Sequence, residues 1–204
     1  MNENPPTSAP PALRTDVSRE LIARAANADL YWTRLVRGQL TDGEIGRGRL
    51  VDYTNADVLR RITDAHGWPG WALVGRAGAT AAWRIALRAD NQPPFQRHAE
   101  RLMHHAVRMG QASPGHWAHL YDRVCLMYGA RQEFGTQYRN GVSGPEREPV
   151  NDEPTLDQRR SKVGLPPAEE SWKRLRERLA AEPSIRSTAE VPAGSLTLTS
   201  VGVA

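Results

Sequence analysis

Polar side chains that could bind a ligand are concentrated just after a stretch with helical periodicity. Gln132, Thr136 and Gln137 follow it closely, with Gly135 among them. Amides and hydroxyls both donate and accept hydrogen bonds, and a glycine lets a ligand approach the backbone closely. The combination predicts a pocket for a polar or anionic small molecule. The alternative interpretation is that the two glutamines only tie a hairpin to the ends of helices.

Asp122 and Arg123 are the candidate catalytic residues next to this cluster. Leu126 follows Asp122 by four residues and lies behind the apolar stripe that contains Trp117 and Val124, so Asp122 is expected between two apolar faces. A buried carboxylate must be paired or hydrogen-bonded. Asp122 therefore either forms a structural ion pair or serves a ligand, by orienting Arg123 or acting as a general base.

Two further arginines, Arg84 and Arg88, are four residues apart on the helix that also carries Asp90. Only two of the 27 basic residues of the chain are lysines. Guanidinium groups bind carboxylate or phosphate through two parallel hydrogen bonds, so this pair could clamp an anion. An ordinary surface stripe is the alternative, and an arginine-rich coding bias would explain the composition of the chain as a whole.

The histidines do not predict a metal site. His98 and His105 are seven residues apart, about 10 Å along a helix axis, which is too far to share one ion. His116 and His119 have the spacing of a chelating pair, but such a pair arises easily by chance among six histidines. We expect no metal and no cofactor, and the role of the second pair stays open. The chain has no P-loop, no HExxH motif and no GxGxxG before a helix.

The elements that must position these residues are mostly helices. Apolar residues recur at helical spacing over residues 17–37, 56–67, 78–90, 93–110 and 114–129, and shorter helical stretches follow at 155–164 and 168–180. Four glycines in residues 38–50 are expected to separate the first helix from the second, which would begin with a cap at Thr54. Asn140-Gly141 suits a hairpin. The predicted fold is mainly α, a compact bundle of about five to seven helices with one short β-hairpin after the helix that carries Asp122.

Length and composition indicate one domain with extensions at both ends. The 204 residues are 39% hydrophobic, below the roughly 45–50% that is usual for globular domains. Residues 1–16, with four prolines, are expected to form a disordered arm, residues 17–182 a single helical domain, and residues 183–204 a flexible tail. We find no apolar run of about 18 residues and no signal peptide, so we expect a cytoplasmic protein without a membrane partner.

The net charge of +4 does not indicate nucleic acid binding. Residues 55–140 carry eleven arginines against six acidic residues, whereas the two ends are nearly balanced. The basic residues are scattered and no recognition motif is present, so a nucleic acid partner is not expected.

A set of motifs in residues 55–165 resembles a bacterial family of unknown function that is common in actinomycetes. The motifs are GWP followed by VG in residues 67–75, the Ala/Trp helix that ends in Arg-Ala-Asp, Phe95-Gln96, Asp122-Arg123-Val124, Gln132 followed by FGTQ, and the late DQRRSKVGLPP. The resemblance implies a compact helical domain with a short hairpin and no established activity. Relatives typically read Gln-His-Ala-Asp where this chain reads Leu87-Arg88-Ala89-Asp90. If that histidine were a base, this chain has replaced it with a permanent cation, which favours a specialised or binding-only role.

These observations lead to one preferred function and one alternative. We expect a small enzyme or ligand-binding protein of bacterial secondary metabolism that acts on an anionic or carbonyl-containing small molecule. Its catalytic residues would be Asp122 and Arg123, and its substrate-binding residues Arg88, Asp90, Gln96, Gln132, Thr136 and Gln137. The alternative is a protein-interaction or accessory module whose disordered ends fold onto a partner. A homodimer is compatible with either.

Overall fold

The computed structural model of the chain describes residues 13–36, 38–141, 144–181 and 197–199. Its helices are α1 (Thr15–Val36), α2 (Asp42–His66), α3 (Trp71–Leu87), α4 (Pro93–Arg108), α5 (Pro114–Met127), α6 (Leu156–Lys162) and α7 (Ala168–Ala181), with a 3-10 turn at Glu153–Thr155. The strands are β1 (Gln137–Gly141), β2 (Gly144–Arg147) and β3 (Thr197–Thr199). The predicted mainly α fold with a short hairpin after α5 is confirmed.

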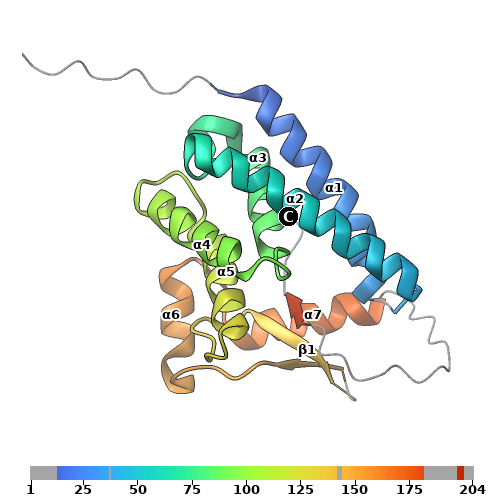
Figure 1. Ribbon diagram of the computed structural model, residues 1–204. Coiled ribbons are helices and arrows are strands. Elements are labelled where there is room, and N and C mark those ends of the chain that lie inside the picture. The colour runs from blue at the N-terminus through green and yellow to red at the C-terminus, as the bar shows by residue number, and fades with distance from the viewer. Residues whose placement is uncertain (1–12, 37, 142–143, 182–196, 200–204) are drawn as a thin grey trace, which may run out of the picture.

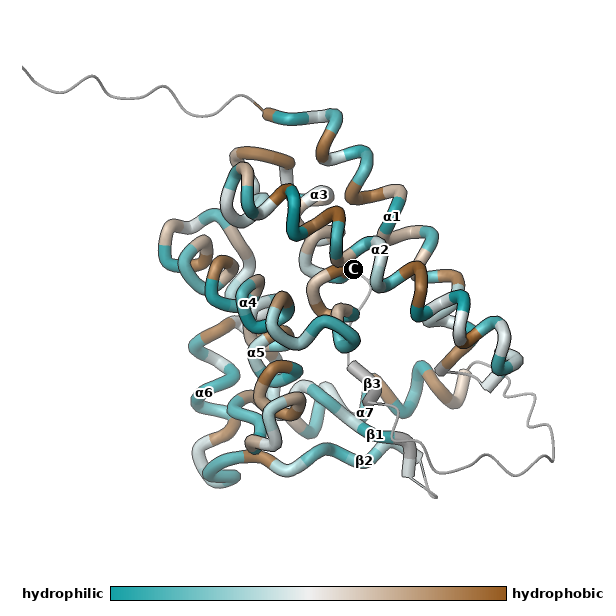
Figure 2. Tube along the Cα trace, viewed as in Figure 1, coloured by the Kyte–Doolittle hydropathy of each residue, from teal (hydrophilic) through white to brown (hydrophobic). Residues whose placement is uncertain are grey.

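Helices α1 to α5 form the larger part of the molecule, and the strands with α6 and α7 lie together at its other end (Figure 1). Helix α3 contacts α1, α2, α4 and α5. Hydrophobic and hydrophilic residues alternate along these helices, as expected for helices with one buried face (Figure 2). The fully buried side chains of the core include Leu21, Leu59, Trp83, Met103 and Leu120. None of the described helices is long and apolar enough to cross a membrane.

The predicted break after the first helix is present at residues 38–41, but its extension to residue 50 is wrong, because α2 begins at Asp42 and not near Thr54. Thr41 and Glu44 form a capping box, in which the Thr41 side chain accepts from the Glu44 N–H and the Glu44 carboxylate accepts from the Thr41 N–H at 2.9 Å. Gly48 lies where α2 meets α1, since an added Cβ would come within 3.2 Å of Tyr31. Three of the four glycines that suggested a linker therefore lie inside a helix, and Gly48 permits close helix packing there.

Replacing Thr41 by alanine is expected to lower the free energy of unfolding by about 1 kcal/mol, because the first turn of α2 loses its cap. Thr54 is the matched control, since its hydroxyl only bonds the Leu50 carbonyl within the helix. Urea unfolding of Thr41→Ala and Thr54→Ala should show a clear loss for the first variant and a change within about 0.5 kcal/mol for the second. A larger loss of stability in Thr54→Ala than in Thr41→Ala would contradict the assignment of Thr41 as the cap of α2.

Helix α3 is the central helix of the bundle. Ala79, Ala82, Trp83 and Ala86 are all buried. Gly75 kinks the helix with φ 69° and ψ 175°, a backbone conformation that favours glycine. The Val74 carbonyl at the kink accepts a hydrogen bond from the Ser18 hydroxyl of α1 at 2.7 Å. A hydrogen bond thus joins the kink to α1. The part of α3 that follows the kink carries Arg76 and Arg84.

The sheet has the order β2-β1-β3, with both pairs antiparallel. Tyr138 pairs with Arg147 and Gly141 with Gly144, so the predicted Asn-Gly lies within β1, and residues 142 and 143 between the strands are outside the described part. Strand β3 comes from the segment predicted as a flexible tail. The rest of that tail and residues 1–12 of the predicted arm also lie outside the described residues.

Candidate functional site

A cavity of about 380 Å³ lies where α1, α2 and the end of α3 meet, with one residue of α5 in its wall. Its apolar and aromatic lining residues are Tyr31, Trp32, Leu35, Leu40 and Ile45, and its polar lining residues are Arg49, Asp52, Arg88, Asp90, Asn91 and Arg123. A lining that combines apolar side chains with a few polar groups is typical of small-molecule sites. The cavity is therefore the candidate binding site.

Arg88 is a partly satisfied cation in the wall of this cavity. Its Nη2 donates to Asp29 Oδ1 at 2.5 Å, and its guanidinium lies over the Trp32 ring, 5.1 Å from the centroid. Its Nη1 is buried and has no hydrogen-bond partner among the described residues. Burial lowers the pKa of Arg88, although Asp29 opposes this. A buried donor left unpaired costs about 1–3 kcal/mol, so the fold keeps one donor of a charged group available at this place.

Asp52, from α2, is an acidic residue in the wall of the same cavity, and its carboxylate and the Arg88 guanidinium attract each other. Burial raises the pKa of Asp52 to about 6, and the charges of Asp90 and Asp29 act in the same direction, whereas the Trp32 hydrogen bond and Arg88 oppose it. The Trp32 indole N–H donates to its Oδ2 at 3.1 Å. A carboxyl group that titrates near pH 6 could both accept and donate a proton. Asp52 is therefore the candidate acid–base group of the cavity.

Asp90 and Arg123 form an ion pair that closes another side of the cavity. Arg123 donates through Nε to Asp90 Oδ1 at 2.8 Å and through Nη2 to Oδ2, in the two-pronged geometry of a strong guanidinium–carboxylate pair. Gln96 donates to the same Oδ1 at 3.0 Å and to the Leu87 carbonyl at the end of α3. Gln96 therefore holds Asp90 in place from inside the core.

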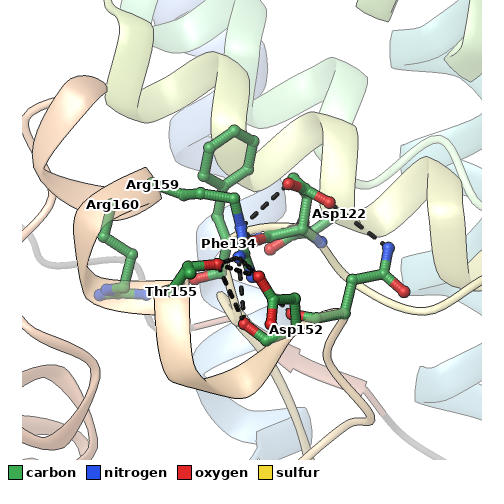
Figure 3. A network of polar contacts seen from close by, with 8 residues as sticks. Asp122, Phe134, Asp152, Thr155, Arg159 and Arg160 are labelled. Atoms are coloured by element: carbon green, nitrogen blue, oxygen red, sulfur yellow. Dashed lines mark hydrogen bonds and ion pairs between the residues drawn. The ribbon is translucent and has the colours of Figure 1, made fainter.

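Asp122 lies in a second, separate polar cluster. Its Oδ1 accepts from the backbone N–H of Glu133 at 2.8 Å and of Phe134 at 3.0 Å, and its Oδ2 accepts from the N–H and hydroxyl of Thr136 at 3.0 and 2.9 Å. Figure 3 shows Asp122 on one side of this loop and Arg160, with the start of α6, on the other side. Four donors saturate the carboxylate, so Asp122 fixes the loop between α5 and β1.

The two glutamines complete this loop cluster. Gln132 donates to the carbonyls of Gln137 and Glu148, and its own side-chain oxygen accepts from the Gln137 N–H at 2.7 Å. Gln137 donates to the His119 carbonyl of α5 at 3.1 Å. Arg160 of α6 donates to the Phe134 carbonyl from below the loop. These bonds tie the hairpin to α5 and α6. This agrees with the alternative interpretation, in which the two glutamines hold the hairpin to the ends of helices.

The predicted site residues thus fall into two groups. Arg88, Asp90 and Arg123 line the cavity, and Gln96 supports Asp90. Asp122, Gln132, Thr136 and Gln137 have fully buried side chains in the loop cluster and do not belong to the cavity wall. The sequence predicts Arg88 close to Asp122, Asp90 or an open cavity that Gln137 reaches; Arg88 lines a cavity, with 15% of its side chain exposed, but Gln137 does not line it.

Three residues that shape the cavity were missed from the sequence, namely Asp29, Trp32 and Asp52. The sequence did contain a signal for Asp52. The Thr41-x-x-Glu44 capping box starts a helix that continues through three glycines. With the helix begun there, Ile45, Gly48 and Asp52 share one face at helical spacing. The pairing of Asp29 with Arg88 joins residues 59 positions apart, and no local pattern indicates it.

The two histidines left open as a metal pair pack against the Trp83 ring, and His119 is buried. His116 stacks on Trp83 with ring centroids 3.9 Å apart, and His119 meets the same ring edge-on. Burial lowers the pKa of His116 to about 4 and that of His119 to about 3, so both are neutral at ordinary pH. Among the described residues, no three histidine, cysteine or acidic side chains are grouped so that they could hold a metal ion.

The chain belongs to DUF6624, described as a family of unknown function, whose model matches residues 44–181. The match contains the region in which the motifs resembled such a family, and it runs from α2 to the end of α7. Helix α1 lies outside it, so the cavity combines residues of the family region, such as Asp52 and Arg88, with Trp32 from α1. Comparison with curated proteins and with solved structures gives no match.

Proposed function

We propose that the cavity between α1, α2 and the end of α3 binds a small molecule that carries a carboxylate or a carbonyl group. The observation that carries this proposal is the buried, unpaired Nη1 of Arg88 in a wall that also presents Asp52. An oxygen atom of a ligand would give this donor the partner it lacks, and a charge-assisted hydrogen bond of this kind is strong in a buried site. The volume of about 380 Å³ suits a molecule at the small end of the usual range for ligand sites.

The charges of the cavity favour a ligand with one negative group. Arg88 shares Asp29 with Arg84, whose Nη1 contacts the other Asp29 oxygen at 3.1 Å, so two cations face one anion. Arg123 is already paired with Asp90. Counting Arg49, Arg84, Arg88 and Arg123 against Asp29, Asp52 and Asp90 leaves one positive charge, and Arg88 is the cation whose buried Nη1 lacks a partner among the described residues. Trp32 and Leu35 would cover the apolar part of the ligand, which places its polar end toward α3.

Asp52 extends the proposal from binding to chemistry. A carboxyl group that exchanges its proton near neutral pH, next to a cation that can hold a developing negative charge on oxygen, is suited to proton transfer beside a carbonyl. In this proposal Arg88 polarises the ligand oxygen, Asp52 moves the proton, and the Asp90–Arg123 pair keeps the wall rigid. The chain would then be a cofactor-independent cytoplasmic enzyme, and without turnover it would be a binding protein.

The proposal predicts that Arg88→Gln weakens ligand binding by at least about tenfold, the effect of losing one charge-assisted hydrogen bond. Arg84→Gln is the matched control, because Arg84 also pairs with Asp29 but does not line this cavity. Thermal unfolding of the wild type in a panel of small carboxylic and keto acids would identify a ligand from its rise in Tm. The same titration would then be repeated on both variants.

Loss of the ligand-induced rise in Arg88→Gln, with retention in Arg84→Gln, is the expected result. An equal loss in both variants would show that the Asp29 network, and not the cavity, determines binding. If no carboxylate or carbonyl compound raised the Tm of the wild type, the proposal would fail and the protein-interaction alternative would gain support.

A further inference from the structure

A second cavity, of about 210 Å³, lies at the opposite end of α3, between its beginning and the beginning of α5. Its walls are formed by Trp68, Trp71, Arg76, Ala79, Thr80, Met103, Ala112, Ser113 and His116. Arg76 and Arg88 are twelve residues apart on α3, about 18 Å along the helix axis. This cavity is therefore distinct from the candidate site, and none of the described residues that line it is acidic.

Arg76 supplies a cation to this second cavity. Its guanidinium lies over the Trp71 ring, 4.1 Å from the centroid. In the described part of the chain, no carboxylate forms an ion pair with it at 4 Å or less. Gly75, where α3 is kinked, directly precedes Arg76. Stacking on an indole fixes the position of a guanidinium while leaving its N–H groups free to donate.

Trp68 supplies a buried donor to the same cavity. Its indole Nε1 is buried and finds no hydrogen-bond acceptor among the described residues, and only 8% of the residue is exposed. A buried indole N–H normally has a partner. The missing partner must be an acceptor, because an indole N–H cannot itself accept.

The beginning of α5 adds a third source of positive potential. Ser113 caps this 14-residue helix and lines the cavity, so the positive end of the helix dipole is directed toward it. His116, in the first turn, is stacked on Trp83 and faces the same space. Arg76 and Trp68 offer only donors, and the N-terminus of α5 adds positive potential, a combination that favours an oxyanion.

We propose that this second cavity binds a small oxyanion, the phosphate or carboxylate group of a metabolite, between the Arg76 guanidinium and the Trp68 indole N–H. The volume admits such a group with a few further atoms. This site is independent of the proposed function, since it shares no residue with the first cavity.

The test is a titration of the full chain with inorganic phosphate, and separately with acetate, followed by ¹H–¹⁵N spectra of the six tryptophan indoles. The Trp68 indole signal, assigned with Trp68→Phe, is expected to shift and saturate with at least one anion. The Trp117 indole, which already donates to Glu100 at 2.7 Å, should stay in place. Arg76→Gln should weaken binding at least about tenfold. Arg97→Gln is the matched control, because Arg97 also stacks on an aromatic ring, that of Tyr128, away from the cavity.

Saturation by phosphate, by acetate or by both supports the proposal and identifies the group that the site prefers. Three results would overturn it: no saturable shift of the Trp68 indole with either anion, an affinity that Arg76→Gln leaves unchanged, or a shift confined to the Trp32 indole of the first cavity. Both arginine variants should keep the wild-type Tm, because both side chains are exposed.

Discussion

Replacing Asp122 by asparagine is expected to lower the free energy of unfolding by about 3–5 kcal/mol, the effect of breaking a buried charged network. The side chain accepts four hydrogen bonds from the loop between α5 and β1. An asparagine keeps one oxygen for two of these donors, but its NH₂ group faces the other two, which are left unpaired. Equilibrium unfolding in urea measures the difference.

Asp64→Asn is the control for this substitution. Asp64 lies exposed on α2, and the same change there should alter stability by no more than about 0.5 kcal/mol. A loss below about 1 kcal/mol in Asp122→Asn would mean that the loop holds its conformation without the carboxylate, and Asp122 would again be available for a role with a ligand.

Replacing Asp52 by asparagine is expected to have the opposite effect and to stabilise the protein at pH 7 by about 2 kcal/mol. The pKa of Asp52 rises from 3.8 to about 6 on folding because the group is buried. The folded state therefore holds a proton more tightly than the unfolded state, and stability falls as pH rises from about 4 to 6. Asparagine has no charge to bury, and its oxygen can still accept from Trp32.

The measurement is the difference in unfolding free energy between Asp52→Asn and the wild type at several pH values from 4 to 8. The difference should be small near pH 4, grow to pH 6 and stay constant above about pH 7. Any turnover of a ligand should disappear in the variant, since an amide cannot transfer the proton. A variant that is less stable than the wild type at pH 7, or a difference that does not change with pH, would show that Asp52 is an ordinary structural carboxylate.

The opposite signs expected for these two substitutions separate two roles that the sequence could not separate. Asp52 and Asp122 are both aspartates in the interior of a helix, so residue type and local pattern do not distinguish them. Burial raises the pKa of both carboxyl groups, but Asp122 accepts four hydrogen bonds that oppose this rise, whereas Asp52 accepts one side-chain hydrogen bond, from Trp32. A destabilising charge kept in a cavity is the pattern of groups that serve a ligand.

The helical bundle was predictable because its helices carry strong local signals. The small residues of α3 and the Ser113 cap of α5 are patterns of this local kind. Helix α2 was predicted too short, since glycine propensity was given more weight than the capping box at Thr41. Gly48 shows why that weight was misplaced, as its lack of a side chain serves packing against Tyr31.

The polar cluster was found from composition, but its role depends on where the backbone directs its N–H groups. The loop turns so that the N–H groups of Glu133, Phe134 and Thr136 point to Asp122. No residue type or spacing encodes that convergence. The cavity was harder to predict, because its cation pairs with Asp29, a residue of another helix far away in the sequence.

The most direct test of the proposed function is a crystal structure of the protein with the small acid that gives the largest rise in Tm. The proposal predicts that a carboxylate or carbonyl oxygen of the ligand lies about 3 Å from Arg88 Nη1, with the remainder of the molecule against Trp32 and Leu35 and toward Asp52. Density for the ligand at another place, with water alone in the cavity at a saturating concentration, would contradict it.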